Sequence, residues 1–394
     1  MPTLNESSTP WGILTGIRPA KLATKLLIDG YTQAQVMEYF KDEYKTTPEK
    51  AALALEVANI EMPIREGIYK DGVSLYIGVP FCPSRCLYCS FITNATKQAA
   101  AMKPEYVRCL KKEISYCSEI IKDSKKRIET VYIGGGTPTA LSANQLDEII
   151  TALYADFDLS NIKEFTVEAG RPDTVTVEKL KVLKKHKIDR ISINPQTMHQ
   201  STLDIIGRAH TPGQICDAVK LARECGFDNI NMDVIAGLPG ENFEMFAQTL
   251  KEVAALSPEN ITVHTMCIKR SSRLKIHLDE YDLTKGLEVS KMVDYAKEFM
   301  AGIGMHPYYL YRQKNQLGNL ENVGYSLPNR DCLYNIYIME EIQSILSLGC
   351  GGVTKTVDRE LDKIERIFNV KEPKDYIERI DEMLERKNML RGEL

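Results

Sequence analysis

The chain has 394 residues, of which 43% are hydrophobic, so it is long enough to bury one large core and a smaller second one. Its 50 basic and 54 acidic side chains give a net charge of -4, which excludes a global attraction to nucleic acid or to an anionic membrane. The sequence has no apolar run long enough to span a bilayer and no basic-then-apolar start typical of a secretion signal. We therefore expect a soluble cytoplasmic protein with no membrane partner and mostly reduced cysteines.

Residues 1–70 have the pattern of a helical segment. Apolar side chains recur at three- and four-residue steps over residues 18–29, 32–44 and 48–60. An apolar stretch around the only tryptophan, Trp11, precedes them. Because such a stretch is unusual at the start of a chain, we expect this segment to be the inner edge of a truncated domain.

Residues 71–283 alternate between short runs rich in β-branched residues and longer stretches of helical period. The strands are expected at residues 74–79, 130–133, 164–168, 190–194, 230–235 and 261–266. The helices are expected at residues 105–121, 143–155, 177–186, 213–225 and 243–256. Strands that are apolar on both faces and joined by helices predict a parallel sheet, here a partial (β/α)6 TIM-like barrel.

After residue 283 the alternation stops. A long helix to residue 301, an aromatic strand-like run over 308–311 and a charged helical end after residue 374 remain. We therefore predict an α/β protein with an α+β C-terminal domain over residues 284–394.

Three cysteines, Cys82, Cys86 and Cys89, lie within eight residues directly after the first predicted strand. In a barrel of this type, function gathers in the loops that follow the strands. Thiolates are soft ligands for zinc or iron–sulfur clusters, and a short loop lets several reach one centre. Such density, with proline and arginine between the thiols, favours a metal site over buried core cysteines.

The metal that these cysteines bind has two interpretations. A structural zinc site needs four ligands, and the sequence has no second Cys-x-x-Cys or His pair to complete it. Three cysteines on a four-iron cluster leave one iron open to a small molecule. Of the remaining cysteines, Cys267, Cys332 and Cys350 are left undecided, whereas four on helix-like segments are expected in the core: Cys109, Cys117, Cys216 and Cys225.

The Cys-x3-Cys-x2-Cys spacing, with an aromatic residue before the last cysteine, resembles the motif of radical S-adenosylmethionine enzymes. Further segments follow in that family's order: Tyr76 to Cys82, Gly134-Gly135-Gly136-Thr137-Pro138, Glu168, Asn194-Pro195-Gln196, Gly207-Arg208-Ala209-His210 and Asp233 to Gly240. They are similar to oxygen-independent coproporphyrinogen III oxidases. The coproporphyrinogen dehydrogenase branch is most similar, because residues 10–19 and 318–325 also look like its segments.

The resemblance implies a [4Fe-4S] cluster on Cys82, Cys86 and Cys89, which are then both metal ligands and catalytic. It also implies S-adenosyl-L-methionine beside the cluster, cleaved by one electron to give a radical that removes hydrogen from the substrate. The residues expected to bind this cofactor are Tyr76, Tyr88, Gly134, Gly135, Gly136, Thr137, Glu168, Gln196, Arg208 and Asp233.

Several of these cofactor residues also have a plainer interpretation. The glycines are expected to let a backbone edge approach the ligand, although they also fit a tight turn. Glu168 could instead pair with Arg171, and Tyr88 could be a core aromatic. At position 78 this chain has glycine where members of that family often have histidine. The role of the family's histidine is therefore not assigned to any residue of this chain.

By resemblance, the substrate is coproporphyrinogen III, whose propionates become vinyl groups, and the electron donor is a protein such as a flavodoxin or ferredoxin. A tetrapyrrole with four carboxylates needs cations near the barrel mouth. The candidates, which also fit a solvated basic loop, are Lys269, Arg270, Arg273 and, beside the aromatic run at 308–311, Arg312.

Three alternatives to this function stay open. A haem carrier of the same family usually has a His-Asn pair followed by Tyr-Trp, but residues 334–339 lack both His and Trp. A radical enzyme acting on haem or another tetrapyrrole is the second, and a zinc protein on the same barrel is the third.

Overall fold

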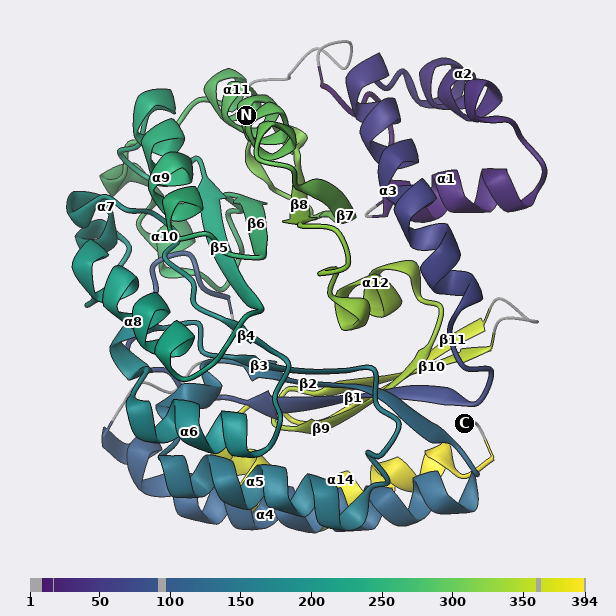
Figure 1. Cartoon of the computed structure of the whole chain (residues 1–394), viewed down its shortest axis with the longest axis vertical. Helices are drawn as coiled ribbons and strands as arrows, with labels where there is room; N and C mark the ends of the chain where they lie inside the picture. Colours follow the sequence, from purple (N-terminus) through teal and green to yellow (C-terminus); the bar gives the residue numbers. More distant parts are fainter. Residues whose placement is uncertain (1–8, 17, 91–96, 359–362, 393–394) are drawn as a thin grey trace.

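The computed structural model describes residues 9–16, 18–90, 97–358 and 363–392, and one curved sheet of 11 strands runs through them (Figure 1). The strands lie in the order β11-β10-β9-β1-β2-β3-β4-β5-β6-β8-β7. The central strands pair in parallel in chain order: β1 Gly72–Val79, β2 Arg127–Gly135, β3 Glu164–Glu168, β4 Arg190–Ser192, β5 Ile230–Ala236 and β6 Asn260–Thr265. The predicted partial barrel of six strands is confirmed.

Crossover helices cover the outer face of these strands (Figure 1). They are α4 Lys97–Asp123, α5 Ala143–Asp156, α6 Val177–Lys185, α7 Gln200–Ile205, α8 Pro212–Glu224 and α9 Phe243–Ala255. Reciprocal capping boxes fix two helix starts, Ser142 with Gln145 at α5 and Thr211 with Gln214 at α8. The short α7 was not predicted, because six residues show too little periodicity.

The residues after 283 extend both edges of the same sheet. Helix α11 (Gly286–Gly302) precedes β7 (His306–Arg312) and β8 (Glu321–Ser326), and β8 pairs antiparallel with β6. At the other edge β9 (Ser344–Gly349) lies parallel to β1, followed by the antiparallel β10 (Val353–Asp358) and β11 (Lys363–Phe368). The domain boundaries after residues 70 and 283 stay predictions. Residues 71–283 and residues 284–394 contribute strands to the same sheet.

Helix α12 (Leu333–Glu340) lies against the concave face of the sheet, in contact with β2 and β7 (Figure 1). The carboxylate of Glu164, at the start of β3, accepts the backbone N–H groups of Leu333 at 3.0 Å and Tyr334 at 3.3 Å. It thereby caps the helix N-terminus from a neighbouring strand. The ring of Tyr334 stacks on Tyr132 at 4.6 Å between centroids, so a tyrosine-rich layer fills the interior of the partial barrel.

The N-terminal helices pack on the edge of the sheet formed by β7. They are α1 Pro19–Ile28, α2 Gln33–Tyr44 and α3 Pro48–Glu66, as the sequence pattern predicted. At the other end of the chain α13 (Pro373–Glu378) and α14 (Ile380–Lys387) pack on α4.

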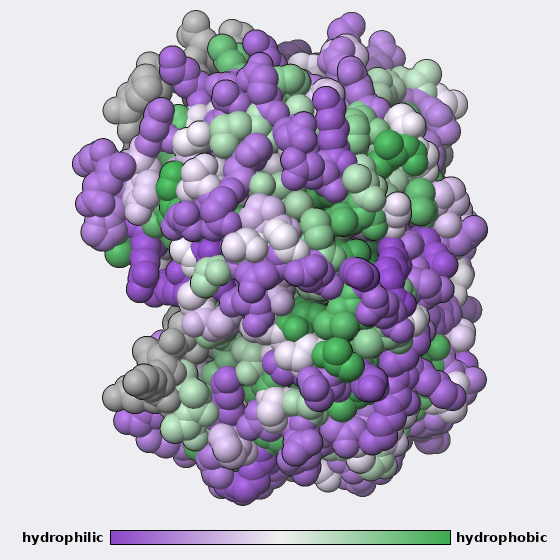
Figure 2. All heavy atoms as spheres, turned by 60° about the vertical axis from the view of Figure 1, so that its left-hand side comes forward, coloured by the Kyte–Doolittle hydropathy of each residue, from purple (hydrophilic) through white to green (hydrophobic). Residues whose placement is uncertain are grey.

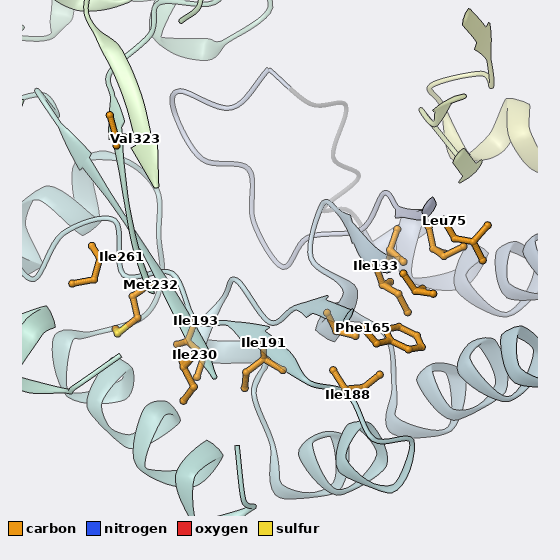
Figure 3. Close-up of a cluster of buried hydrophobic side chains, with 14 of the residues drawn as sticks. Leu75, Ile133, Phe165, Ile188, Ile191, Ile193, Ile230, Met232, Ile261 and Val323 are labelled. Atoms are coloured by element: carbon orange, nitrogen blue, oxygen red, sulfur yellow. The ribbon is translucent and has the colours of Figure 1, made fainter. Parts of the chain in front are cut away.

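The main core lies between the parallel strands and their crossover helices. Figure 3 shows residues from successive strands pointing into it, among them Leu75, Ile133, Phe165, Ile191 and Ile230, all at most 1% exposed. Burial on both faces explains why these strands are continuous apolar runs. Within the described part of the chain, no helix is both long and apolar enough to cross a membrane.

Candidate active site

The loop after β1 brings Cys82, Cys86 and Cys89 to one wall of a cavity of about 330 Å³. Residues in or just after β2 to β6 form much of the other walls, because the carboxyl ends of parallel strands meet at one edge of the sheet. Tyr311 of β7 and Asn322 of β8 complete them. The cavity residues named in the sequence prediction are Tyr76, Tyr88, Gly135, Gly136, Thr137, Glu168, Gln196, Arg208, Asp233 and Lys269. One surface therefore gathers most of the residues predicted for the site.

Backbone hydrogen bonds hold the cysteine loop in place. The N–H of Leu87 donates to the carbonyl of Ile206 at 3.0 Å, and its own carbonyl accepts from Leu274 at 3.0 Å. Ser84 Oγ donates to the carbonyl of Gly207 at 2.9 Å. The loop is thus fixed between the end of α7 and the short helix α10 (Arg273–Ile276).

The glycine turn after β2 is needed for packing against this loop. A Cβ atom on Gly136 would stand 2.7 Å from the carbonyl oxygen of Phe81, and one on Gly134 would stand 3.0 Å from the Glu168 carboxylate. The backbone N–H of Gly136 donates to Val79 O at 2.7 Å. Gly134 does not line the cavity. The sequence interpretation expected a close approach to a ligand, whereas these contacts are made with the protein itself.

The thiol of Cys82 lies 3.3 Å from Thr137 Oγ1. Burial raises the pKa of Cys82 to about 11, and the hydrogen bond to Thr137 partly opposes this. Among the described residues, no three His, Cys, Asp or Glu side chains lie close enough together to hold one metal ion.

Glu168 is a cavity carboxyl group whose pKa is raised to about 7. Burial is the main cause, and the negative charge of Asp233 adds to it. Two donors oppose the rise, Tyr132 Oη at 2.7 Å and the N–H of Gly135 at 3.2 Å. Glu168 therefore can accept or donate a hydrogen bond near neutral pH. It does not pair with Arg171, whose Nε lies 3.0 Å from Asp173 Oδ1.

Asp233, His264 and Tyr311 form a polar row across the far side of the cavity. His264 Nε2 lies 3.6 Å from Asp233 Oδ2, and His264 Nδ1 lies 3.5 Å from Tyr311 Oη. Burial alone would raise the pKa of Asp233, but His264 and the amide of Asn231, which donates at 2.8 Å, hold it below its usual value. Asp233 therefore stays a carboxylate.

Two buried side chains in the cavity wall have polar atoms without a partner. Arg208 donates to the carbonyls of Asn194 at 2.5 Å and Gly170 at 2.9 Å, while its Nε is unpaired. Gln196 is 7% exposed and its Oε1 is unpaired. Its left-handed backbone (φ 67°) is held by hydrogen bonds to Asp233 and Ile235 of β5. Buried polar atoms normally have partners, so this wall is suited to a polar ligand.

Of the four cations predicted to meet the substrate, the structure brings only Lys269 to the cavity. Arg270 is exposed outside it, and Arg273 lines a separate hollow. Arg312 is 5% exposed and donates to the carbonyl of Leu14 at 2.6 Å and to Asn319 Oδ1 at 2.8 Å. Burial lowers the pKa of Arg312 to about 10. It holds the chain together instead of facing a substrate.

Of the tyrosines in the aromatic run at 308–311, Tyr311 lines the cavity, whereas Tyr308 and Tyr309 are buried in the layer beneath. Tyr88 lines the cavity, so it is not a simple core aromatic.

Cys216 was expected in the core but is exposed on α8, and Cys225 is only half-buried. Of the undecided cysteines, Cys332 and Cys350 are buried, whereas Cys267 lines the cavity: it follows β6.

Several cavity residues were missed from the sequence, notably His264, Gln313 and Asn322. His264 is the one titratable side chain in the predicted strand 261–266, a signal that could have identified it. Gln313 and Asn322 reach the cavity only because β8 pairs with β6 and β7 pairs with β8. Nothing in their local sequence indicates this pairing.

Comparison with known proteins agrees with this geometry. Residues 76–253 match the family model described as the radical SAM superfamily. The chain is 45% identical over 380 residues to the oxygen-independent coproporphyrinogen-III oxidase-like protein HemZ of Bacillus subtilis, covering 96% of this chain and 76% of that protein. This chain belongs to the radical SAM superfamily. The family implies a [4Fe-4S] cluster and S-adenosylmethionine as cofactors.

Two further relatives are informative. The heme chaperone HemW of Lactococcus lactis is 31% identical over 288 residues, which are 71% of this chain and 68% of that protein. The solved coproporphyrinogen III oxidase (HemN) of Escherichia coli superposes with a TM-score of 0.65 at 21% identity, over 83% of this chain and 73% of that one. The HemN likeness establishes the fold alone.

Proposed function

We propose that this radical SAM protein is an oxidoreductase that acts on a tetrapyrrole in the cytoplasm under anaerobic conditions. Its reaction is the oxidative decarboxylation of coproporphyrinogen III propionates to vinyl groups. The observation that carries the proposal is the convergence of three thiols and two unpaired buried polar atoms, those of Gln196 and Arg208, on one cavity. The name of the HemZ relative supplies the substrate class.

The residues present fit the implied cofactors. Three thiols are a ligand set for an iron–sulfur cluster that leaves one iron open, and Cys82, Cys86 and Cys89 supply them. The unpaired Oε1 of Gln196 and Nε of Arg208 offer one acceptor and one donor to S-adenosylmethionine. When bound, the cluster and S-adenosylmethionine supply one-electron chemistry that yields a carbon radical able to remove hydrogen from the substrate.

The protein's own side chains position these molecules, and the surroundings of each side chain set its charge. Arg208 is anchored by two carbonyl oxygens, so its direction is set before a ligand arrives. Asp233 remains an anion opposite the thiols, whereas Glu168 can hold its proton near pH 7. Lys269 offers a cation to a substrate carboxylate at the cavity wall.

The experiment is an anaerobic reaction of the reconstituted protein with S-adenosylmethionine, a reductant and a panel of tetrapyrroles, followed by mass spectrometry. We expect 5′-deoxyadenosine together with loss of carbon dioxide from coproporphyrinogen III. Turnover of haem or another tetrapyrrole, and not of coproporphyrinogen III, would identify that tetrapyrrole as the substrate. A reaction that releases no 5′-deoxyadenosine would overturn the proposal.

A second candidate function is haem binding for delivery, because a heme chaperone is among the relatives above 30% identity. The segment where such carriers have a His-Asn pair is Tyr334-Asn335 here. Tyr334 is 5% exposed and stacked on Tyr132, and it does not line the cavity. Stoichiometric haem uptake without product formation would favour this candidate over the enzyme.

A further inference from the structure

Arg171 is a cavity residue to which the proposed function assigns no role. It lies three residues after β3 and lines the cavity, yet it is only 2% exposed. Figure 2 shows a mostly hydrophilic outer surface, where charged side chains are in contact with water. A buried guanidinium needs partners from the protein instead. The identity of those partners indicates what Arg171 does.

Two groups occupy all three guanidinium nitrogens of Arg171. Nε and Nη2 donate to the two carboxylate oxygens of Asp173 at 3.0 and 3.2 Å, which is bidentate geometry. Nη1 donates to Ser84 Oγ at 3.0 Å and to Ser84 O at 3.3 Å. Arg171 therefore differs from Arg208, whose Nε is left for a ligand.

Ser84 belongs to the cysteine loop and lies between its first two cysteines. Its hydroxyl accepts from Arg171 and donates to the carbonyl of Gly207 at 2.9 Å. This serine thus links the loop after β1 both to the loop after β3 and to the end of α7. The link is separate from the backbone hydrogen bonds of Leu87, and it attaches a cation to the loop.

The turn that carries Arg171 is itself fixed. The Arg171 carbonyl accepts the backbone N–H of Thr174 at 2.9 Å and Thr174 Oγ1 at 2.7 Å. Thr174 Oγ1 also lies 2.6 Å from Thr139 Oγ1, just after β2. Because these hydroxyl groups are buried, the direction of the Arg171 side chain is set before any ligand enters the cavity.

The charge of Arg171 is only partly cancelled by its carboxylate partner. The Arg171 side chain is 3% exposed, whereas that of Asp173 is 19% exposed, so water screens the carboxylate more than the guanidinium. Asp173 is bonded at the Nε and Nη2 edge and Ser84 at Nη1, on the other side of the guanidinium. The cation therefore stands between the cysteine loop and the anion.

We propose that Arg171 is a positioning residue that fixes the cysteine loop through Ser84 and favours the uptake of an electron by the centre that the three thiols hold. The inference rests on the proposed function, in which this centre receives one electron from a reductant. The reductant is oxidised and the centre is reduced, so the centre gains negative charge. A cation beside the loop stabilises the reduced form and raises the midpoint potential.

Three substitutions separate the link from the charge. Arg171→Lys keeps the charge but cannot bond Asp173 and Ser84 as the planar guanidinium does. Arg171→Gln removes both the charge and the bidentate pair. Asp173→Asn removes the opposing anion and leaves Arg171 in place. Lys181→Gln, at an exposed position on α6, removes a cation away from the cavity and is the control.

Hydrogen exchange of the full-length, cofactor-free protein reports on the link, measured by mass spectrometry on peptides that cover residues 82–89. We expect exchange about 10-fold faster in both Arg171 variants than in the control. The midpoint potential of the reconstituted cluster reports on the charge, measured by a dithionite titration followed by electron paramagnetic resonance. We expect this potential to fall in Arg171→Gln, to stay near the wild-type value in Arg171→Lys and to rise in Asp173→Asn.

Equal exchange in the control and in the Arg171 variants would overturn the link. Loosening of the loop alone would shift the potentials of both Arg171 variants together. Equal potentials in these two variants, or no rise in Asp173→Asn, would therefore overturn the role of the charge. A wild type that holds the cluster but releases no 5′-deoxyadenosine would overturn the proposed function, while the order of the potentials would still decide the role of Arg171. A wild type that holds no cluster would overturn both the proposed function and the role of the charge, and hydrogen exchange would still decide the link.

Discussion

Trp11 donates its indole Nε1–H to Glu321 Oε2 at 2.7 Å, linking residues 310 positions apart in the chain. The other oxygen of Glu321 accepts from Lys50 at 2.7 Å. The next residue, Asn322, lines the cavity and accepts the N–H of Thr265 at 2.7 Å. The N-terminal helices therefore support the cavity wall that is farthest from them in sequence.

The first prediction concerns this link. Trp11→Phe removes the donor but leaves Glu321 buried, so we expect a loss of about 1–3 kcal/mol in the free energy of unfolding. Urea unfolding followed by circular dichroism measures it. Ile13→Ala, at a side chain that is 53% exposed, is the control and should change little. An equal loss in both variants would contradict the role of the hydrogen bond.

The second prediction concerns the thiols. After anaerobic reconstitution the wild type should be brown and hold about four iron and four sulfide per chain, whereas Cys86→Ala should lose most of both. Cys216→Ala removes an exposed thiol outside the cavity and should match the wild type. Iron and acid-labile sulfide assays measure the difference. Uptake of zinc by the wild type in place of iron would refute the cluster assignment.

The third prediction is a pH dependence. Because the pKa of Glu168 is raised from 4.5 to about 7, the folded ligand-free protein keeps a proton that the unfolded chain has released between these values. Stability therefore falls as pH rises through this window, by about 3 kcal/mol from this group. Glu168→Gln should remove that part of the slope in urea unfolding. Glu38→Gln, at an exposed position, should keep it.

The fourth prediction concerns two buried carboxyl groups that face each other outside the cavity. Glu61 of α3 is 1% exposed and Glu340 of α12 is 2% exposed. Burial raises the pKa of Glu61 well above 4.5, and the charge of Glu340 raises it further. The folded state therefore loses stability as pH rises above 4.5. Glu61→Gln should be more stable than the wild type at pH 8 by about 1–3 kcal/mol, as judged by thermal and urea unfolding.

The advantage of Glu61→Gln should vanish as the pH falls toward 4, where the wild-type carboxyl group is protonated in both states. Glu66→Gln, at an exposed position on the same helix, should show no such pH-dependent gain. A variant that is less stable than the wild type at pH 8 would show that Glu61 acts as a paired carboxylate.

Much of the barrel could be predicted from periodicity, because each parallel strand is buried on both faces and each crossover helix is amphipathic. Glu164 to Glu168 is a strand with the predicted limits. The edge strands β8 to β11 were missed, since their partners are set by pairing across the sheet. Local pattern could not indicate that Glu164 caps α12, or that Arg312 is buried against Leu14.

The cysteine loop is the part of the site that sequence reasoning placed best, because three cysteines within eight residues need no long-range contact to lie near one another. The sequence prediction was least successful for the cations that were expected to bind the substrate. Positive charge after β6 was taken to face the barrel mouth, but of that run only Lys269 lines the cavity. Whether a side chain in a loop points inward depends on the hydrogen bonds of that loop to α7 and the cysteine loop, which composition does not encode.

The pairing of β1 with β9, in which Val73 lies beside Ser344, affects how the chain folds during its synthesis. During synthesis β1 emerges long before β9, because strands β2 to β8 lie between them in the chain. Until then it presents an unpaired edge that can associate with other chains. The strand that leads into the thiol loop therefore gains its second neighbour only after the whole partial barrel between β1 and β9 has been synthesised.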